Sequence, residues 1–407
     1  MPEAFLIGGA RTPVGRYGGT LSSIRPDDLA ALTLRAAVER AGIDPGAVDE
    51  VILGNANGAG EENRNVARMA WLLAGFPDTV PGITVNRLCA SGLSAIIMAS
   101  HMVKAGAADI VVAGGVESMS RAPWVMEKPH KAFAKPGAVV DTSIGWRFPN
   151  PAFVSGELSR DGKATYSMPE TAEEVARVYG ISRDDCDEFA VRSHERALDA
   201  ITAGHFADEI VPVTVKGRKG AETIVDTDEG PRPGTTREVL AGLRPVVKGG
   251  SVVTAGNAST LNDGASAIIV ASEAAVQKYG LMPRARILDC ASAGVGQEIM
   301  GIGPVPATRK VLDRTGLAVG DLAAVELNEA FASQALACLR ELKLEPGIVN
   351  NDGGAIALGH PLGSSGSRLV ITLLGRLERE VTEGRKLGLA TMCVGVGQGT
   401  ALLLEGL

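Results

Sequence analysis

The sequence contains few cysteines, few aromatic residues and no long apolar segment. Its five cysteines form no CxxC pair, and their odd number argues against a disulfide framework or a zinc site. No apolar run reaches the roughly eighteen residues that a membrane-spanning helix requires. The first residues, MPEAFLIGGARTPVG, lack the basic region and apolar block of a signal peptide. We therefore expect a cytoplasmic protein that holds no metal and has no membrane partner.

An excess of basic residues is also missing. Lys and Arg number 40 against 47 Asp and Glu, which gives a formal net charge of −7. That balance argues against a protein that binds nucleic acid electrostatically. Hydrophobic residues make up 45% of the 407 residues, enough to bury one large core or two. The composition therefore predicts a globular protein with no nucleic-acid partner.

Short apolar runs alternate with longer helix-like patterns in the first third of the chain. The strand-like runs VDEVILGNA, GITV and ADIVVAGG are separated by helical patterns in NRNVARMAWLLAG and between residues 89 and 105. This alternation predicts an α/β fold in which parallel strands are buried between helices.

The last third of the chain repeats this order. VDEVILGN resembles AAVELNEA, and RLCASGLSA resembles PLGSSGSRL. Val51 then matches Val325 and Cys89 matches Gly363, and both pairs are 274 positions apart (325 − 51 and 363 − 89). Two independent matches at one offset indicate a duplicated domain.

A long segment interrupts the duplication. The first half is assigned to residues 1–119 together with 250–275, and the second half to residues 276–407. The insertion is assigned to residues 120–249. The insertion contains Trp, Pro and charged residues, and it is predicted to form two helices, one starting at Pro169 and one capped by Ser182. An insertion of this length usually carries functional loops; a decorative or oligomerising insertion is the alternative.

Cys89 lies between a strand-like and a helix-like run, among Asn, Ser and Gly. A thiol in the first turn of a helix is close to the positive end of the helix dipole and to unpaired N–H groups. Both favour the thiolate, which is the nucleophilic form. From the residues alone, a nucleophile and a structural cysteine are equally supported. Cys186, Cys290 and Cys338 are interpreted as small buried hydrophobic residues.

Three further positions carry residues suited to chemistry. His360 stands in a glycine-rich turn between a strand and a helix, and an imidazole pKa near neutrality suits removal of a proton from a thiol. Cys393 ends an apolar run followed by alternating glycines, whose backbone N–H groups could face a small anionic oxygen. Asn328 and Glu329 lie between a strand and a helix, where a helix cap is the simpler interpretation.

Four motifs together resemble a known family. NRLCASG, NEAFA, GGAIALGHPLGSSGSR and CVGVGQG occur in the order found in the thiolases, which make or cleave 3-oxoacyl-CoA. The resemblance runs from ARTPVGRYGG near the N-terminus to CVGVGQG. It implies two similar βαβαβαββ halves in a five-layered α-β-α-β-α core, with an inserted loop domain over the CoA site. It also implies a homodimer or homotetramer, with ENRNVARMAWLLAG at a subunit contact.

The resemblance also implies a ping-pong mechanism with CoA and acetyl-CoA as substrates and no permanently bound cofactor. Cys89 would be the acylated nucleophile, and His360 would take its proton. Cys393 would protonate the departing acetyl-CoA enolate, or remove that proton in condensation. One oxyanion site would come from His360 and a water held by Asn328, and another from the backbone N–H groups of Cys89 and Gly395.

The CoA site is also implied by the resemblance. It would be lined by Ser259, Met168, Arg232, Leu261, Ala330 and Phe331. Arginine beside the nucleotide phosphates is physically reasonable. Two positions depart from many thiolases, since Ser167-Met168-Pro169 replaces His-Met-Gly and Thr260 replaces Gly after Ser259. We therefore expect the pantetheine contacts to differ in detail.

The loop sequences IGWRFPNP and SMPETAEEVA resemble the thiolases that cleave 3-oxoadipyl-CoA in aromatic-compound degradation. A dicarboxylic acyl tail would need a cation, and Arg147, Arg160 and Lys163 are candidates, with solvated loop residues as the alternative. Two other functions remain open here. One is a ketoacyl-synthase-type condensing enzyme, which Cys393 argues against, and the other is a non-catalytic acyl-CoA-binding scaffold.

Overall fold

Strands from both halves of the chain form one continuous ten-stranded sheet. The computed structural model describes residues 2–155 and 163–407. The order of the sheet is β12-β13-β14-β11-β1-β10-β5-β3-β4, with β2 (Gly15–Arg16) paired to β10. The strands of the first half are β1 (Ala4–Arg11), β3 (Glu50–Gly54), β4 (Gly82–Val85), β5 (Ile110–Ser118) and β10 (Asn262–Ser272). Those of the second half are β11 (Ala285–Gly294), β12 (Ala324–Leu327), β13 (Lys386–Val394) and β14 (Gln398–Gly406).

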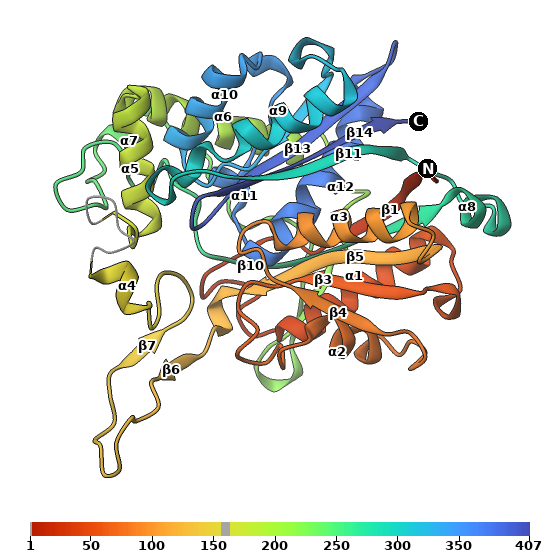
Figure 1. Cartoon of the computed structure of the whole chain (residues 1–407), viewed down its shortest axis with the longest axis horizontal. Helices are drawn as coiled ribbons and strands as arrows, with labels where there is room; N and C mark the ends of the chain where they lie inside the picture. The colour runs from red at the N-terminus through yellow and green to blue at the C-terminus, as the bar shows by residue number, and fades with distance from the viewer. Residues whose placement is uncertain (1, 156–162) are drawn as a thin grey trace.

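Helices lie between and outside the two sets of strands, so that the strands of the two halves form separate layers. The helices of the core are α1 (Pro26–Ala41), α2 (Val66–Leu73), α3 (Ser91–Lys104), α9 (Pro304–Thr315), α10 (Ala332–Leu342) and α12 (Leu362–Glu380). α3 and α12 pack on each other between the two sets of strands, α1 and α2 lie outside the first set, and α9 and α10 lie outside the second (Figure 1). The predicted five-layered α-β-α-β-α core is confirmed.

The two halves have the same internal topology. Each has antiparallel and parallel pairs in the same order, β1-β10-β5-β3 and β11-β14-β13-β12. The fifth strand of the first half, β4, is reduced in the second half to a single parallel bridge. Val349 bridges Val325 there, as Gly82 pairs with Val51 in the first half. The duplication inferred from the sequence repeat is therefore a structural one.

Glycines set the distance between the two central helices. A Cβ on Gly92 of α3 would lie 2.5 Å from the carbonyl oxygen of Gly363, and a Cβ on Gly366 of α12 would overlap the backbone of Leu93. A Cβ on Gly363 itself would overlap the carbonyl oxygen of Val116. Only residues without a side chain allow this approach, and it brings the N-terminal ends of α3 and α12 together.

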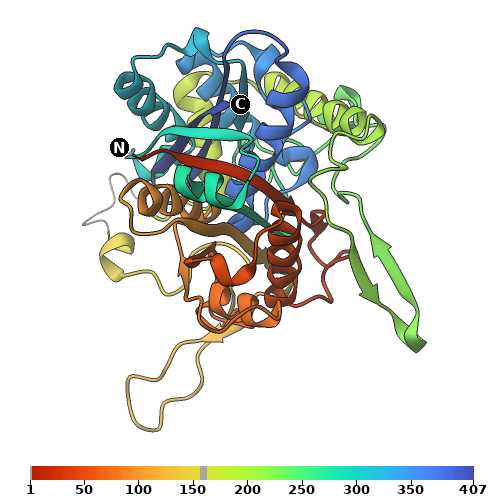
Figure 2. The ribbon, with the colours of Figure 1, turned by 90° about the vertical axis from the view of Figure 1, so that its right-hand side faces the viewer.

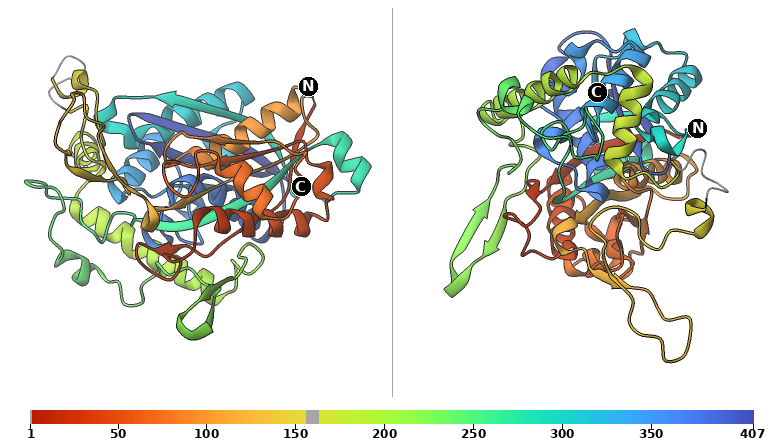
Figure 3. Two further views of the ribbon diagram at one scale, coloured as in Figure 1. Left: turned by 90° about the horizontal axis from the view of Figure 1, so that it is seen from below. Right: turned by 90° about the vertical axis from the view of Figure 1, so that its left-hand side faces the viewer.

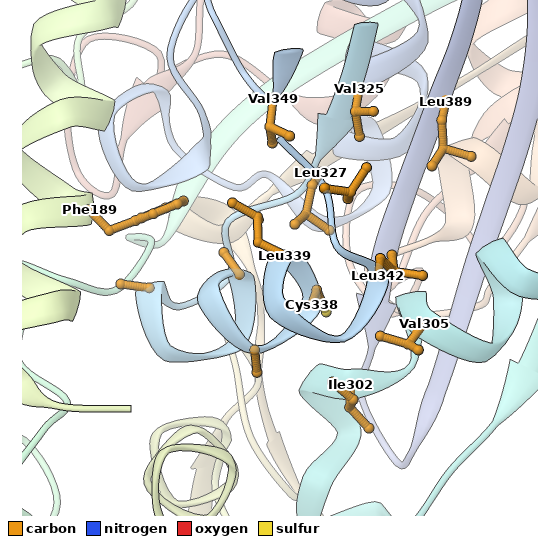
Figure 4. Close-up of a cluster of buried hydrophobic side chains, with 14 of the residues drawn as sticks. Phe189, Ile302, Val305, Val325, Leu327, Cys338, Leu339, Leu342, Val349 and Leu389 are labelled. Atoms are coloured by element: carbon orange, nitrogen blue, oxygen red, sulfur yellow. The ribbon is translucent and has the colours of Figure 1, made fainter. Parts of the chain in front are cut away.

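The hydrophobic cores lie on both sides of these central helices. Figure 4 shows one of them, in which α10 packs on β12 and β13 through Leu327, Leu339 and Leu389. Cys338 lies in this core with its thiol directed at the carbonyl oxygen of Gly301, at 3.3 Å. Cys186 is also buried there, so these two cysteines pack as small hydrophobic residues, as predicted.

The insertion contributes four helices and two hairpins to the described structure. They are β6 (Trp124–Met126), β7 (Val139–Asp141), α4 (Pro151–Val154), α5 (Met168–Tyr179), α6 (Arg183–Thr202), β8 (Val213–Lys216), β9 (Glu222–Val225) and α7 (Arg237–Ala241). α8 (Glu273–Tyr279) and α11 (Ala355–Leu358) complete the chain. Ser182 caps α6 by accepting from the N–H of Asp185 at 3.1 Å, as predicted. The hairpins β6–β7 and β8–β9 project from the body (Figures 2 and 3).

No helix in the described part of the chain is long and apolar enough to cross a bilayer. Within the same residues, no three or more His, Cys, Asp or Glu side chains are grouped as metal ligands would be.

Candidate active site

Two adjoining pockets meet at Cys89. The larger has a volume of about 570 Å³, and its walls include Cys89, His360 and all six residues expected at the CoA site, namely Ser259, Met168, Arg232, Leu261, Ala330 and Phe331. The smaller has a volume of about 260 Å³ and is lined by Cys89, Gly395, Glu117 and the loop around Arg147. We call them the large pocket and the small pocket. Residues from both halves and from the insertion thus share one site.

Cys89 lies in a tight turn just before α3. The helix begins at Ser91, two residues later than the predicted start. Leu88 has a left-handed backbone, with φ of 47°, which is uncommon for a residue with a side chain. The turn is held by Asn86, whose side chain accepts from the N–H of Leu88 at 2.8 Å, and by Ser91, whose hydroxyl accepts from the N–H of Arg87 at 2.9 Å.

Burial dominates the electrostatics of Cys89. It raises the pKa of the thiol to about 11, while the backbone N–H groups of Gly395 and of Cys89 itself lower the pKa by a smaller amount. The N–H groups therefore act in the direction expected from the sequence, but burial outweighs them. The resting thiol is protonated at neutral pH and needs a base.

His360 lies between α11 and α12 with both ring nitrogens occupied. Ser365 donates its hydroxyl to the carbonyl of Pro361 at 2.9 Å, so its oxygen accepts from Nδ1–H of His360, at 2.6 Å. Nε2 is then the unprotonated nitrogen, and it accepts from Nδ2 of Asn328 at 3.4 Å. Burial lowers the pKa of His360 to about 3, and the charge of Arg368 adds to this. The imidazole is neutral, and Nε2 is the ring nitrogen that can take a proton.

Cys393 and Asn328 lie behind the wall of the large pocket. Cys393, near the end of β13, packs with Met300, Ala330 and Phe331, which line that pocket. Burial raises the pKa of the Cys393 thiol well above its usual value, and Cys89 and Cys338, when ionised, raise that pKa further. The side-chain oxygen of Asn328 is buried and has no hydrogen-bond partner among the described residues.

The β13–β14 turn places Gly395 beside Cys89. Val396 and Gly397 have positive φ angles of 62° and 76°, and this left-handed pair reverses the chain directly after Gly395. The N–H of Gly395 then points at the sulfur of Cys89. A backbone N–H in this position can also stabilise an anionic oxygen on an acyl group attached to that sulfur.

The whole chain matches models of one family. The family models described as "Thiolase, N-terminal domain" and "Thiolase, C-terminal domain" match residues 4–274 and 281–406. The chain belongs to the thiolase family. Its activity is thus acyl transfer between CoA and acetyl-CoA by cleavage or condensation of 3-oxoacyl-CoA. The family match favours a thiolase over the two alternatives, a ketoacyl-synthase-type enzyme and a non-catalytic scaffold.

Named relatives cover its full length. A beta-ketoadipyl-CoA thiolase of Pseudomonas aeruginosa is 58% identical over 406 residues, covering 99% of each chain. A 3-oxoadipyl-CoA/3-oxo-5,6-dehydrosuberyl-CoA thiolase of Escherichia coli strain K12 is 55% identical over 408 residues, covering both chains completely. The crystal structure of the Bacillus anthracis acetyl-CoA acetyltransferase has a TM-score of 0.91 at 42% identity, covering 100% of this thiolase and 99% of that chain.

Several pocket residues of this thiolase could not be found from the sequence. Arg16, Met300 and Leu362 line the large pocket, but they are far from one another along the chain. Arg16 lies in ARTPVGRYGG, a segment that resembles the thiolases, but the resemblance assigned no role to Arg16. Glu329 does not cap α10, whose N-cap is Phe331. Instead it accepts from Ser193 at 2.6 Å and joins α6 to the end of β12.

The remaining cysteine, Cys290, and one candidate cation, Lys163, are not part of the site. Cys290 is buried, and its sulfur lies 3.3 Å from Nε2 of His101 in a different pocket. Lys163 forms an ion pair with Glu174 at 2.6 Å. Arg160 lies outside the described residues. Arg147 lines the small pocket.

Proposed function

We propose that this thiolase acts on 3-oxoacyl-CoA esters whose acyl chain ends in a carboxylate, such as 3-oxoadipyl-CoA. The relatives at 55% and 58% identity, which are named for this substrate, support the proposal. The observation that carries it is the position of Cys89 at the junction of two pockets. One pocket can hold the CoA arm and the other the acyl group that remains on the enzyme.

CoA and acetyl-CoA would bind in the large pocket as substrates, and the enzyme would need no permanently bound cofactor. The residues proposed to contact them are Ser259, Leu261, Met168, Arg232, Ala330 and Phe331. Arg232 would pair with phosphate, because a guanidinium binds phosphate through paired N–H groups. The apolar walls formed by Met168 and Phe331 suit the pantetheine arm.

In the first half-reaction His360 would take the proton of Cys89. The sulfur would attack C3 of the 3-oxoacyl group, and the C2–C3 bond would break. Burial disfavours a thiolate on Cys89 and an imidazolium on His360 when either forms alone. When the two form together, their opposite charges attract each other. The N–H groups of Cys89 and Gly395 would stabilise the oxyanion on C3. His360, with a water on the free oxygen of Asn328, would stabilise the acetyl-CoA enolate.

Cys393 would then protonate C2 of the enolate and release acetyl-CoA. In the second half-reaction the Cys393 thiolate would take the proton of the CoA thiol, and the CoA sulfur would attack the acyl group on Cys89. The bond from the acyl carbon to the Cys89 sulfur would break, the sulfur would regain its proton from His360, and the shortened acyl-CoA would leave. In the direction of condensation Cys393 would remove the proton from C2. A protonated, buried thiol beside Cys89 suits this role.

We also propose the domain division given by the repeat, with halves formed by residues 1–119 with 250–275 and by 276–407. The segment 120–249 would be a loop domain covering the CoA site. Its Ile144, Met168, Arg232 and Val246 all contribute to the large pocket, which supports the proposal.

We propose that the working enzyme is a homodimer or homotetramer. Helix α2 leaves Met69, Leu72 and Leu73 exposed at 36%, 42% and 47%, and adjacent exposed apolar residues commonly mark a protein–protein contact. This is the segment at which thiolases are expected to meet. Sedimentation at several concentrations tests this point.

A substrate panel tests the proposed function. 3-Oxoadipyl-CoA, acetoacetyl-CoA and 3-oxohexanoyl-CoA would be compared in the cleavage direction, and the intact protein weighed after each is added without free CoA. We expect the highest kcat/KM with 3-oxoadipyl-CoA and a mass gain on Cys89 corresponding to a four-carbon diacid acyl group. A higher kcat/KM with acetoacetyl-CoA would refute the dicarboxylic substrate class, and the absence of any mass gain would refute Cys89 as the nucleophile.

A further inference from the structure

The small pocket is mainly apolar and contains a single basic side chain. Its described walls include Leu88, Trp146 and Val396, and Arg147 is the one Lys or Arg among them. The segment that carries Arg147 joins β7 to α4 at the edge of the molecule (Figure 1). An acyl group attached to the Cys89 sulfur would enter this pocket, because the large pocket is needed for CoA.

Arg147 is held at one end of its guanidinium. Nη1 donates to Oδ1 of Asn57 at 2.9 Å. Asn57 is fixed in turn, because its Nδ2 donates to Oγ1 of Thr142 at 2.9 Å and its backbone N–H donates to Glu117 at 3.1 Å. The adjacent Trp146 donates its indole N–H to the carbonyl of Tyr166 at 3.2 Å. The guanidinium is therefore oriented before substrate binds, which lowers the entropy cost of binding.

The remaining N–H groups of Arg147 have no acceptor among the described residues, and no carboxylate of that part of the chain lies within ion-pair distance. This contrasts with Lys163, whose charge is neutralised by Glu174. A partly buried, oriented guanidinium with no counter-ion among the described residues matches the geometry of a carboxylate, which accepts two parallel N–H bonds.

The pocket also contains one acid, and it is already occupied. Glu117 accepts hydrogen bonds from the backbone N–H groups of Ala56 at 2.9 Å, Asn57 at 3.1 Å and Gly363 at 2.9 Å. Its oxygens are therefore engaged by the backbone and not by Arg147. No acid in the described part of the chain therefore engages the guanidinium of Arg147, which leaves it for a ligand.

We propose that Arg147 binds the terminal carboxylate of the acyl chain in the small pocket and selects dicarboxylic 3-oxoacyl-CoA over neutral chains of the same length. This assignment rests on the proposed function, since it places the acyl group on Cys89. Asn57 is a positioning residue that holds Nη1 of Arg147.

The test compares Arg147→Gln with the wild type on 3-oxoadipyl-CoA and on 3-oxohexanoyl-CoA, which has the same chain length without the carboxylate. A hydrogen bond to a charged group is worth about 1.5–3 kcal/mol, so kcat/KM for 3-oxoadipyl-CoA should fall roughly 10- to 100-fold. That for 3-oxohexanoyl-CoA should change less than about threefold, because surface and loop polar changes are usually within 0.5 kcal/mol. Activity on the neutral substrate also shows that the variant is folded.

Two matched variants complete the design. Arg147→Lys should retain part of the preference, because it keeps the charge but loses the paired geometry. Lys163→Gln removes a cation of the same insertion that is already paired with Glu174, and it should leave the preference unchanged. An equal loss on both substrates in Arg147→Gln, or an unchanged preference, would overturn the assignment. If the wild type itself does not prefer 3-oxoadipyl-CoA, the proposed function fails instead, and the two failures are distinguishable.

Discussion

The amide of Asn328 lies 3.4 Å from the imidazole of His360, with Nδ2 directed at Nε2. Together with the bond from Nδ1 to Ser365, this contact fixes both the tautomer and the plane of the ring. A neutral imidazole with its proton on Nδ1 can take a second proton only at Nε2, and His360 lines the large pocket. The predictions below depend on this arrangement and on the burial of the two sulfurs.

Replacing His360 with Asn should remove the base and slow acylation of Cys89. General-base catalysis is typically worth about 10²–10⁴-fold, and we expect a loss of that size in kcat with 3-oxoacyl-CoA. Rapid-quench measurement of acyl-enzyme formation checks this. Ser365→Ala serves as the milder companion, because it removes only the acceptor for Nδ1–H. Acylation at the wild-type rate in His360→Asn would show that another group accepts the proton.

The raised pKa of Cys89 predicts a steep pH dependence of alkylation. With a pKa of about 11, the thiolate fraction should increase about tenfold for each pH unit between pH 7 and 10. Iodoacetamide labelling of the free enzyme, followed by mass spectrometry of the Cys89 peptide, gives the rates. A plateau beginning below pH 8 would mean that the resting enzyme already holds a thiolate. Cys393→Ser excludes labelling of the second sulfur.

The two cysteines should be separable by substitution. Cys89→Ser should lose acyl transfer, by a factor on the order of 10⁴ or more if it resembles loss of other catalytic nucleophiles. Cys393→Ser should still become acylated but should not exchange the α-proton of acetyl-CoA. NMR detection of deuterium incorporation from D₂O checks the second statement, and exchange at the wild-type rate would contradict it.

Close contact between α3 and α12 predicts a stability effect that reaches the site. Gly92→Ala would place a Cβ 2.5 Å from the carbonyl oxygen of Gly363. Overpacking of this kind costs about 1–3 kcal/mol of stability, so we expect a lower melting temperature. We also expect a lower kcat, because Cys89 and His360 lie just before the first residues of these two helices. Gly137→Ala is the matched control, since a Cβ there meets no atom within 4 Å.

Local patterns predicted much of this architecture. The 274-residue offset correctly matched Val51 with Val325, since each is paired by a parallel neighbour in the same place of its half. Ser182 was recognised as a cap because a cap depends on only four consecutive residues. The residues expected at the CoA site from the family resemblance all line one pocket, because each was matched within a motif of several residues.

Properties that depend on distant neighbours were not predictable. The first turn of a helix suggested a thiolate at Cys89, but the pKa is set by burial under residues from both halves. Met300 has no motif of its own and lines the large pocket only because α5 and α10 pack beside it. The choice between Arg147 and Lys163 depended on Glu174, which neutralises Lys163, and no local pattern shows that pairing in advance.

Gly363 occupies in the second half the place that Cys89 occupies in the first, and the carbonyl of Val116 leaves no room there for any side chain. The present packing therefore excludes a reactive side chain at this position of the second repeat. Saturating the enzyme with an acyl donor should accordingly label each polypeptide once, on Cys89, while the second repeat supplies His360, Asn328 and Cys393 to the same reaction.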